Sequence, residues 1–556
     1  MPFKSTFPDL DLPQTDVLTY LFPPGSTPSE DPLWISAADT SENLSPRQLL
    51  QWVKRLAIGL DRLGIKENEA VMIHTPNHIF VPVAYLGIVG SRRVFSGANP
   101  IYTVQEMAYQ IKNTQTKVVF AHPSVASITV EGAVLAGLPR ESVYLFSQRP
   151  TESFDGMKDW RAILGSEQEA DAYQFRPMTP SESTTTVATV NYSSGTTGLP
   201  KGVMISHANL VANVEQHLIM KYAHKKWKAH NHPPERWVGA LPLYHAYGQL
   251  WAMMMCIKLR VPIYVMEKFG FEPYLRVIQT HRITHLQAAP PMLVMLAKRP
   301  ETKKYDLSSV TDCMCGAAPL SRELQNEVSK RFGIEVIQGW GMTEVTCGAT
   351  LVAGGISDNS GSVGQLHPNI ECKLLDDDGK EVAEGEPGEI FVRGPNICLG
   401  YWRNEEATKE SLSPDGWFKT GDVAIVKKGW FWIVDRKKEL IKVNALQVAP
   451  AELEAALLEH DAVADAAVVG ITLHEEEWPR AYVTLKDEYK GKFTEEDIQK
   501  WIAGRVAKHK ALVGGVAFID EVPKLASGKI MRKVMKEWAK RDAPILQKEG
   551  KLKARL

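Results

Sequence analysis

The chain has 556 residues, of which 44% are hydrophobic and 23% are charged, and its formal net charge is −1. This length exceeds what one hydrophobic core supports, so we expect two or more domains, and the near-neutral charge gives no indication of nucleic-acid binding. The six cysteines show no metal-ligand spacing, which favours reduced thiols inside a cell. The N-terminus carries no apolar signal core, and we expect no transmembrane segment because no run of about 20 apolar residues occurs.

The first part of the chain alternates helix-like and strand-like segments. Ser45 and Pro46 form a helix start, with Ser45 as N-cap and Pro46 at the first helical position. Residues 70–74 and 117–121 are apolar and strand-like, and residues 80–89 between them are helix-like. Such alternation predicts a largely parallel sheet. We find no catalytic constellation here and expect a structural role.

A polar, glycine-rich stretch follows at residues 191–202, between a Thr- and Val-rich run at 184–190 and an apolar run at 203–206. Both flanking runs predict strands. Glycines let backbone N–H groups approach an anion closely, hydroxyls add short donors, and a lysine adds a charge, so the stretch predicts a polyphosphate loop. It is not a Walker A sequence, and the alternative is a polar surface hairpin. The candidate phosphate-binding residues are Ser193, Ser194, Gly195, Thr196, Thr197 and Lys201.

The sequence Ser-Ser-Gly-Thr-Thr-Gly-Leu-Pro-Lys-Gly at 193–202 resembles the phosphate-binding loop of adenylate-forming enzymes, which include acyl-CoA synthetases, adenylation domains and luciferases. Further motifs extend the resemblance from about Phe7 to Lys533, and it is closest to 4-coumarate–CoA ligase-like enzymes. The resemblance implies an α/β protein. A large multi-layer N-terminal adenylation domain with mostly parallel sheets would span 1–435, and a small mobile α/β C-terminal domain would span 436–556.

The motif Leu-Pro-Leu-Tyr-His-Ala-Tyr-Gly ends at Gly248 and follows a strand-like segment. A lone histidine is more often a satisfied core residue, but the resemblance implies that His245 lies beside the acyl carboxylate. Tyr247 and Trp251 would then line the acyl pocket. Lys268 resembles a lysine near the 3′-phosphate of CoA, with an ordinary surface lysine as the alternative.

The small-residue stretch 315–320 and the stretch 338–344 resemble the segments that enclose adenine and border the acyl group. Thr343 would donate to the α-phosphate, and Glu344 would hold Mg²⁺, a cation that prefers oxygen ligands. Trp340 stands where coumarate-type ligases usually have Tyr; the larger ring should keep the stacking contact but loses a phenol contact. The nucleotide residues implied here are Ala317, Gln338, Gly339, Trp340 and Thr343, and the acyl-pocket residues are Gly316, Gly341 and Met342.

Asp422 resembles the carboxylate that accepts both ribose hydroxyls, since its two oxygens suit a vicinal diol. The charged segment after the strand-like 430–434 resembles the hinge between the two domains, near 435–437. The resemblance implies that Arg436 reaches the ribose or a phosphate. It implies that Lys438 and Lys442 face the adenylate or the acyl carboxylate. Gln447 matches the coumarate-type pattern, and the resemblance implies that it belongs to the nucleotide site.

One segment departs from the coumarate-type pattern. The Lys-Gly pair that lines the pantetheine tunnel is replaced by Asn444 and Ala445, which removes a charge near CoA and a residue that takes positive φ freely. This departure keeps open an adenylating enzyme that does not use CoA, such as a luciferase-like oxygenase or a free-standing adenylation protein. A non-catalytic nucleotide- or acyl-binding descendant is a further alternative, against which the retained Glu344, Asp422 and Lys529 argue.

The remaining sequence predicts a small α/β domain, with Thr494 as a helix N-cap and a strand at 516–519. The stretch 523–533 resembles the catalytic-lysine loop and makes Lys529 the strongest single candidate. No carrier domain follows, so we do not expect a peptide-synthetase module. The last three residues, Ala554-Arg555-Leu556, resemble a peroxisomal address read by an import receptor, with a solvated cytosolic tail as the alternative.

The resemblance implies an ATP- and Mg²⁺-dependent acid–thiol ligase that forms an acyl-adenylate and then transfers the acyl group to CoA. Tyr247, Trp251, Trp340 and Met342 suggest an apolar, aryl-accepting pocket. We therefore expect phenylpropanoid or arylacetic acids as substrates, with medium-chain fatty acids as the second candidate.

Overall fold

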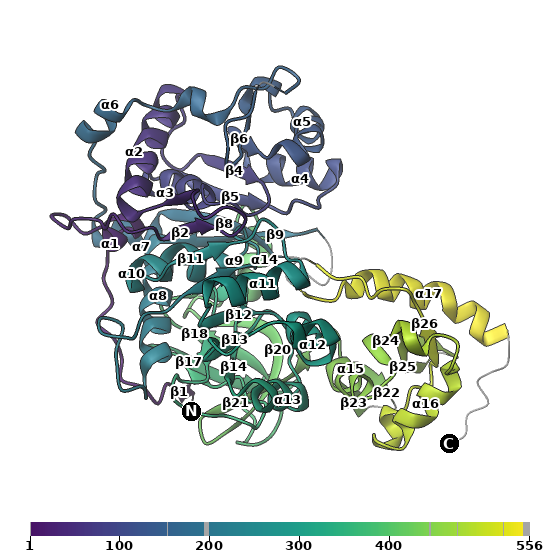
Figure 1. The fold of residues 1–556 in the computed structure, drawn as a ribbon. Coiled ribbons are helices and arrows are strands. Elements are labelled where there is room, and N and C mark those ends of the chain that lie inside the picture. The colour runs from purple at the N-terminus through teal and green to yellow at the C-terminus, as the bar shows by residue number, and fades with distance from the viewer. Residues whose placement is uncertain are drawn as a thin grey trace.

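The computed structural model describes residues 2–152, 154–193, 199–443, 446–474, 476–525 and 528–548. Figure 1 shows a large body formed by the N-terminal part of the chain and a small body, coloured yellow-green to yellow, formed by the C-terminal part. The predicted mixed α/β fold, with a large domain of mostly parallel sheets and a small α/β domain, is confirmed. No helix among the described residues has the length and apolarity needed to cross a membrane.

The first sheet of the large domain has seven strands in the order β19-β9-β8-β5-β4-β6-β7. Its middle is parallel, and β8 and β9 form an antiparallel hairpin at one side. The strands are β4 (Ala70–His74), β5 (Val94–Ala98), β6 (Val118–Ala121), β7 (Val143–Leu145), β8 (Val187–Ser193), β9 (Lys201–Ser206) and β19 (Gly400–Tyr401). Helix α2 (Pro46–Arg62) precedes β4, and α3 (Val81–Gly90), α4 (Val104–Thr114) and α5 (Ala126–Leu135) follow β4, β5 and β6.

The second sheet has nine strands in the order β16-β15-β14-β13-β12-β10-β11-β2-β3. The six strands from β2 to β14 are parallel, so their carboxyl ends meet along one edge. The strands are β2 (Trp34–Ser36), β3 (Asn43–Leu44), β10 (Trp237–Gly239), β11 (Ile263–Val265), β12 (His285–Ala288), β13 (Asp312–Cys315), β14 (Glu335–Trp340), β15 (Thr350–Leu351) and β16 (Gln365–Leu366). The associated helices are α8 (His207–Tyr222), α11 (Phe271–His281), α12 (Pro290–Lys298) and α13 (Arg322–Phe332).

A third, antiparallel sheet completes the large domain in the order β1-β17-β18-β20-β21. It consists of β1 (Phe3–Lys4), β17 (Glu371–Leu375), β18 (Gly388–Arg393), β20 (Phe418–Lys427) and β21 (Trp430–Arg436). The buried side chains of all three sheets belong to one large hydrophobic cluster, with smaller clusters at its margins. Strand β21 runs from this sheet toward the small domain.

The small domain has its own cores, on either side of the sheet β24-β25-β26. Its strands are β22 (Ile441–Val443), β23 (Leu446–Val448), β24 (Val463–Leu473), β25 (Glu476–Leu485) and β26 (Val516–Phe518), and its helices are α15 (Pro450–Leu458), α16 (Glu495–Ala503) and α17 (Arg532–Lys548). In Figure 1, α12 and α15 lie where the two bodies meet. A hydrogen bond from the Lys298 ammonium to the Leu458 carbonyl joins those two helices.

Local capping signals explain where the helices begin. Ser45 and Thr494 both form the predicted N-caps, each closed as a capping box by the residue three positions later. The predicted strand start at Thr184 is wrong. Residues 180–185 form helix α7 (Pro180–Thr185), because Thr179 caps it and Pro180 favours the first turn, and β8 begins only at Val187.

Candidate active site

The candidate site lies beyond the carboxyl ends of the parallel strands in the nine-stranded sheet, the usual place for a site in an open α/β sheet. After β13 the chain turns at Gly316 and Ala317, and Ala317 takes a φ of 73°, a conformation that costs free energy for any residue with a Cβ. After β14 the chain passes Gly341, where an added Cβ would lie 1.8 Å from the Cys347 carbonyl oxygen. Only glycine fits there, so the segment after Trp340 is tightly folded.

The phosphate-loop hairpin brings its lysine to this edge. Ser193 and Lys201 are paired at the end of β8 and β9. The Lys201 ammonium lies 4.9 Å from the centre of the Tyr401 ring, and the Tyr401 hydroxyl donates to Glu344 Oε1 at 3.0 Å. The structure therefore joins the loop lysine and the predicted metal carboxylate through one tyrosine. Ser194, Gly195, Thr196 and Thr197 lie outside the described residues, and their phosphate-binding role stays a prediction.

The buried carboxylate of Asp422 has a partner on each oxygen. The Trp340 indole N–H donates to Oδ2 at 2.8 Å, and Arg436 Nε lies 3.3 Å from Oδ1. Asp422 and Arg436 are also opposite each other in the β20–β21 ladder. The predicted ribose carboxylate and the predicted arginine thus form one unit with the predicted adenine-stacking residue.

Lys529 enters the same site from the small domain. Its loop is seated against the large domain: a Cβ at Gly528 would lie 3.0 Å from Pro291 Cδ at the start of α12. Burial and the neighbouring Arg436 charge lower the pKa of Lys529 to about 8, while Asp422 and Glu344 act in the opposite direction. The lysine, both carboxylates and the arginine are therefore close enough to influence one another.

His245 stands at the start of the short helix α9 (Ala246–Gly248), where its ring Nδ1 accepts from the Tyr247 backbone N–H. Since Nδ1 accepts this bond, a neutral ring carries its proton on Nε2. Burial and the Lys529 charge lower the pKa of His245 to about 3, so the imidazole is neutral at pH 7. It can donate one hydrogen bond without adding charge.

The predicted acyl-pocket aromatics meet in the segment that follows. A π-helix, Gln249–Met255, continues from α9, and such helices are frequent at functional sites. The rings of Tyr247 and Trp251 lie edge to face with centres 6.4 Å apart. The Tyr247 hydroxyl donates to the Met314 carbonyl, so this part of the site presents ring surface rather than a free hydroxyl. A Cβ on Gly316 would lie 3.6 Å from the Tyr247 ring, and Met342 is half-buried.

Several of the predicted site residues lie outside the group around Lys529, Glu344 and Asp422. Lys268, Lys438, Lys442 and Gln447 are exposed. The Gln338 side chain donates to Gln325 on α13. Gly339, predicted for the nucleotide site, lies in β14. Thr343, predicted to donate to the α-phosphate, lies in the single turn Thr343–Val345. Asn444 and Ala445 fall outside the described residues. The roles of all these residues stay predictions.

Sequence reasoning missed Tyr401. Its place is set by β19 pairing with β9, Tyr401 opposite Val203, across about two hundred residues of chain. Burial and the Glu344 carboxylate raise the pKa of its phenol, so the hydroxyl remains a donor. No local pattern marks this residue, because its neighbour in space comes from a distant hairpin.

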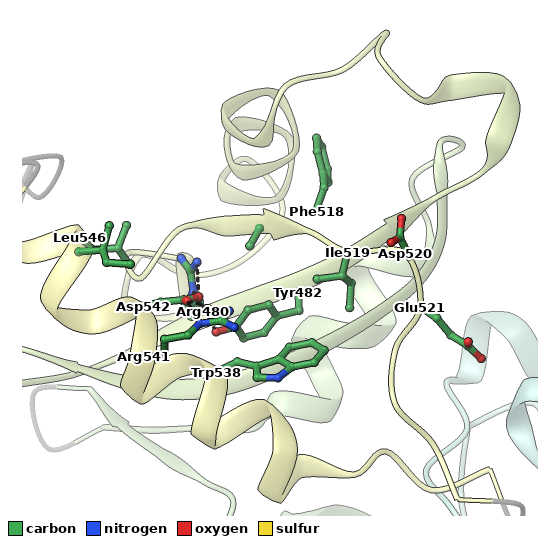
Figure 2. A pocket seen from close by; sticks show the side chains of 12 residues that line it. Arg480, Tyr482, Phe518, Ile519, Asp520, Glu521, Trp538, Arg541, Asp542 and Leu546 are labelled. Atoms are coloured by element: carbon green, nitrogen blue, oxygen red, sulfur yellow. Dashed lines mark hydrogen bonds and ion pairs between the residues drawn. The ribbon is translucent and has the colours of Figure 1, made fainter.

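A separate hollow of about 710 Å³ lies in the small domain among β25, β26 and α17 (Figure 2). Its most buried charge, Arg480, is already paired with Asp542, which also accepts from the Tyr482 hydroxyl. None of the residues predicted for catalysis or binding lines it. The candidate active site is the group around Lys529, Glu344 and Asp422.

Known proteins match this arrangement along most of the chain. The AMP-binding enzyme family matches residues 26–402, and the AMP-binding enzyme C-terminal domain matches residues 452–529. The chain belongs to the AMP-binding enzyme family. Within that family it is similar to acyl-CoA ligases. It is 35% identical to a phenylacetyl-CoA ligase of Aspergillus niger over 96% of this chain and 98% of the relative. It is 32% identical to a probable 4-coumarate–CoA ligase of Dictyostelium discoideum over 96% and 97%. The resemblance stated from the motifs is confirmed.

Solved structures also match most of the chain. ATP-bound MatB from Rhodopseudomonas palustris aligns with a TM-score of 0.79 at 27% identity, covering 94% of this chain and 99% of that chain. The apo form of the same protein, at 26% identity and covering 95% and 99%, gives 0.69. The fold described here is therefore closer to the ATP-bound structure than to the apo structure of that relative.

Proposed function

We propose that the enzyme is an AMP-forming acid–CoA ligase whose two half-reactions share the candidate active site. The observation that carries this proposal is the entry of Lys529, from the small domain, into the group formed by His245, Glu344 and Asp422 of the large domain. A cation placed there would meet the reacting carboxylate and the α-phosphate together.

In the first half-reaction, a carboxylate oxygen of the acid attacks the α-phosphorus of ATP, and the bond to the β-phosphate oxygen breaks. Acyl-adenylate and pyrophosphate result. Lys529 and the Lys201 loop would neutralise the charge on the reacting groups, while neutral His245 could donate to the acid from Nε2. The protein's contribution is positioning and preorganised charge, which together account for most of the rate enhancement in such transfers.

Magnesium fits this arrangement as a shared ion. No three His, Cys, Asp or Glu side chains within the described ranges form a complete metal cluster, and Glu344 has one carboxylate oxygen committed to Tyr401. Mg²⁺ commonly takes one or two protein carboxylates and completes its shell with phosphates and water. Glu344 would hold the ion, which supplies charge neutralisation on the phosphates.

In the second half-reaction, the thiol of CoA attacks the acyl carbonyl, AMP leaves, and the thioester forms. Lys529 occupies the site in the arrangement described, so we propose that the small domain rotates between the halves and removes it. Lys437 is held to the large domain by its ion pairs with Asp377 and Glu389 and by its backbone bond to Gly421. The pivot would then follow Lys437, at the C-terminal end of the predicted hinge.

For the acid we propose an arylacetic or phenylpropanoid type, with medium-chain fatty acids second. The support is the aromatic wall made by Tyr247 and Trp251 and the commitment of the Tyr247 hydroxyl to the backbone. The similarity to a phenylacetyl-CoA ligase and to a 4-coumarate–CoA ligase points the same way. We further propose import into peroxisomes through Ala554-Arg555-Leu556, which lie outside the described residues.

A substrate panel tests the function. Purified enzyme is incubated with ATP, Mg²⁺ and single acids of the aryl, phenylpropanoid and fatty classes, with and without CoA, and AMP and thioester are quantified. We expect CoA-dependent AMP release with aryl acids. Pyrophosphate release with CoA present but without conversion of the acyl-adenylate to thioester would favour an adenylating enzyme that does not use CoA. The Asn444-Ala445 departure motivates that alternative.

A further inference from the structure

Trp340 offers a hydrogen-bond donor, its indole N–H, as well as the face of its ring. Trp340 is buried at the end of β14, and its backbone N–H donates to the Thr350 hydroxyl at 3.2 Å. This bond holds the main chain of Trp340 to β15. Its only polar side-chain atom, Nε1, points to Asp422 Oδ2 at 2.8 Å.

The Asp422 carboxylate has a limited number of acceptor positions. Its two oxygens together accept about four hydrogen bonds. Trp340 fills one position on Oδ2, and Arg436 approaches Oδ1 at 3.3 Å. About one position remains on each oxygen. That remainder matches the two hydroxyls of a vicinal diol.

We propose that Trp340 is a positioning residue that fixes the Asp422 carboxylate for the ribose diol, so that the enzyme distinguishes ribonucleotides from deoxynucleotides through an indole N–H. This rests on the proposed function, in which Asp422 binds the ribose of ATP and AMP. A buried carboxylate with only Arg436 as partner could rotate about its terminal bond, because Arg436 is itself partly exposed. The N–H adds a second, rigid contact from within the large domain.

The test measures nucleotide binding without acid or CoA. Dissociation constants of AMP, 2′-deoxy-AMP and 3′-deoxy-AMP are determined by calorimetry for the parent, Trp340→Phe and Trp340→Leu. Both substitutions remove the N–H, whereas only Phe keeps an aromatic ring. A hydrogen bond to a buried charge is worth roughly 10- to 100-fold in binding. We expect both variants to lose about tenfold in the preference for AMP over each deoxynucleotide, with Leu weakening all three ligands further by a common factor.

Two controls separate positioning from packing. Trp237 also donates its indole N–H to a buried carboxylate, Glu235 Oε2 at 2.8 Å, and Trp237→Phe should leave the AMP preference unchanged. In an Asp422→Asn background, Trp340→Phe should change the preference less than about threefold, because coupled residues are not additive.

Equal weakening of all three nucleotides by Trp340→Phe and Trp340→Leu, with the preference preserved, would overturn the assignment and leave the proposed function standing. A parent enzyme that binds neither AMP nor ATP would overturn the proposed function and this assignment together.

Discussion

Replacing Lys529 by alanine tests the proposed mechanism in its first half-reaction. The ammonium is brought from the small domain to within electrostatic reach of Glu344, Asp422 and Arg436. Loss of one well-placed charged donor costs on the order of 100- to 1000-fold in rate, or about 2.7–4 kcal/mol in the barrier. We therefore expect Lys529→Ala to slow pyrophosphate release by about that factor.

The pH dependence follows from the pKa of about 8 that burial and Arg436 give Lys529. The protonated lysine is the active form, so about nine-tenths of the free enzyme is competent at pH 7 and about one-tenth at pH 9. Since kcat/KM reports the free enzyme, kcat/KM for ATP should fall about tenfold per pH unit above pH 8. Lys529→Arg should flatten that limb, because a guanidinium does not titrate there.

The assay follows each half-reaction separately. Pyrophosphate release is measured by a coupled assay, and thioester formation is measured from pre-made acyl-adenylate plus CoA. The second rate should stay within about threefold of the parent enzyme, since its transition state gains nothing from a lysine that has left. The exposed Lys533 gives a matched control, and Lys533→Ala should leave both rates unchanged. Equal loss in both halves for Lys529→Ala would refute the domain-rotation mechanism.

Four further predictions concern other parts of the chain. Trp251→Ala should shift preference toward bulkier acids in a panel of AMP-release assays, and an unchanged ranking would show that Trp251 only packs against Trp237 and His217. Tyr401→Phe should raise the Mg²⁺ concentration for half-maximal pyrophosphate release roughly tenfold, as loss of an outer-shell partner does. Tyr222→Phe, which removes an equivalent bond to Glu235, should leave that concentration unchanged. Equal effects of the two substitutions would contradict the assignment of Glu344 as the Mg²⁺ ligand. Ala445→Trp should slow thioester formation while sparing pyrophosphate release, and the opposite order would place residue 445 away from the CoA path. A fluorescent protein fused to the last twelve residues should collect in peroxisomes and disperse when Leu556 is deleted, whereas a diffuse signal from the intact tail would contradict the address.

The motifs indicated residues that the structure brings together: Trp340, Asp422 and Arg436 are in contact, and Lys529 lies near Asp422 and Glu344. Their roles stay predictions. The two strands that flank the loop at 191–202 and the helix caps at Ser45 and Thr494 follow from local signals, and the structure has them. The strand start at Thr184 was wrong because a Thr-Pro helix start overrides the β-propensity of the threonines that follow.

Long-range contacts could not be predicted from the sequence. From the sequence, tryptophan in place of the usual tyrosine at position 340 indicated only the loss of a phenol contact. In the structure, the Trp340 indole N–H donates to Asp422, 82 positions away. Tyr401 reaches Glu344 through the β19–β9 pairing. Both contacts depend on how separate sheets pack, which residue patterns within one segment do not encode.

The most direct test of the central claim is a single-vessel product balance. Enzyme, ATP, Mg²⁺, CoA and an arylacetic acid are mixed, and AMP, pyrophosphate and acyl-CoA are quantified over time by chromatography. The proposed function predicts all three products in equal amounts. When CoA is omitted, it predicts that pyrophosphate release stops after the first turnover and that no AMP is released. ADP and phosphate as the products, or AMP and pyrophosphate accumulating without any thioester, would contradict it.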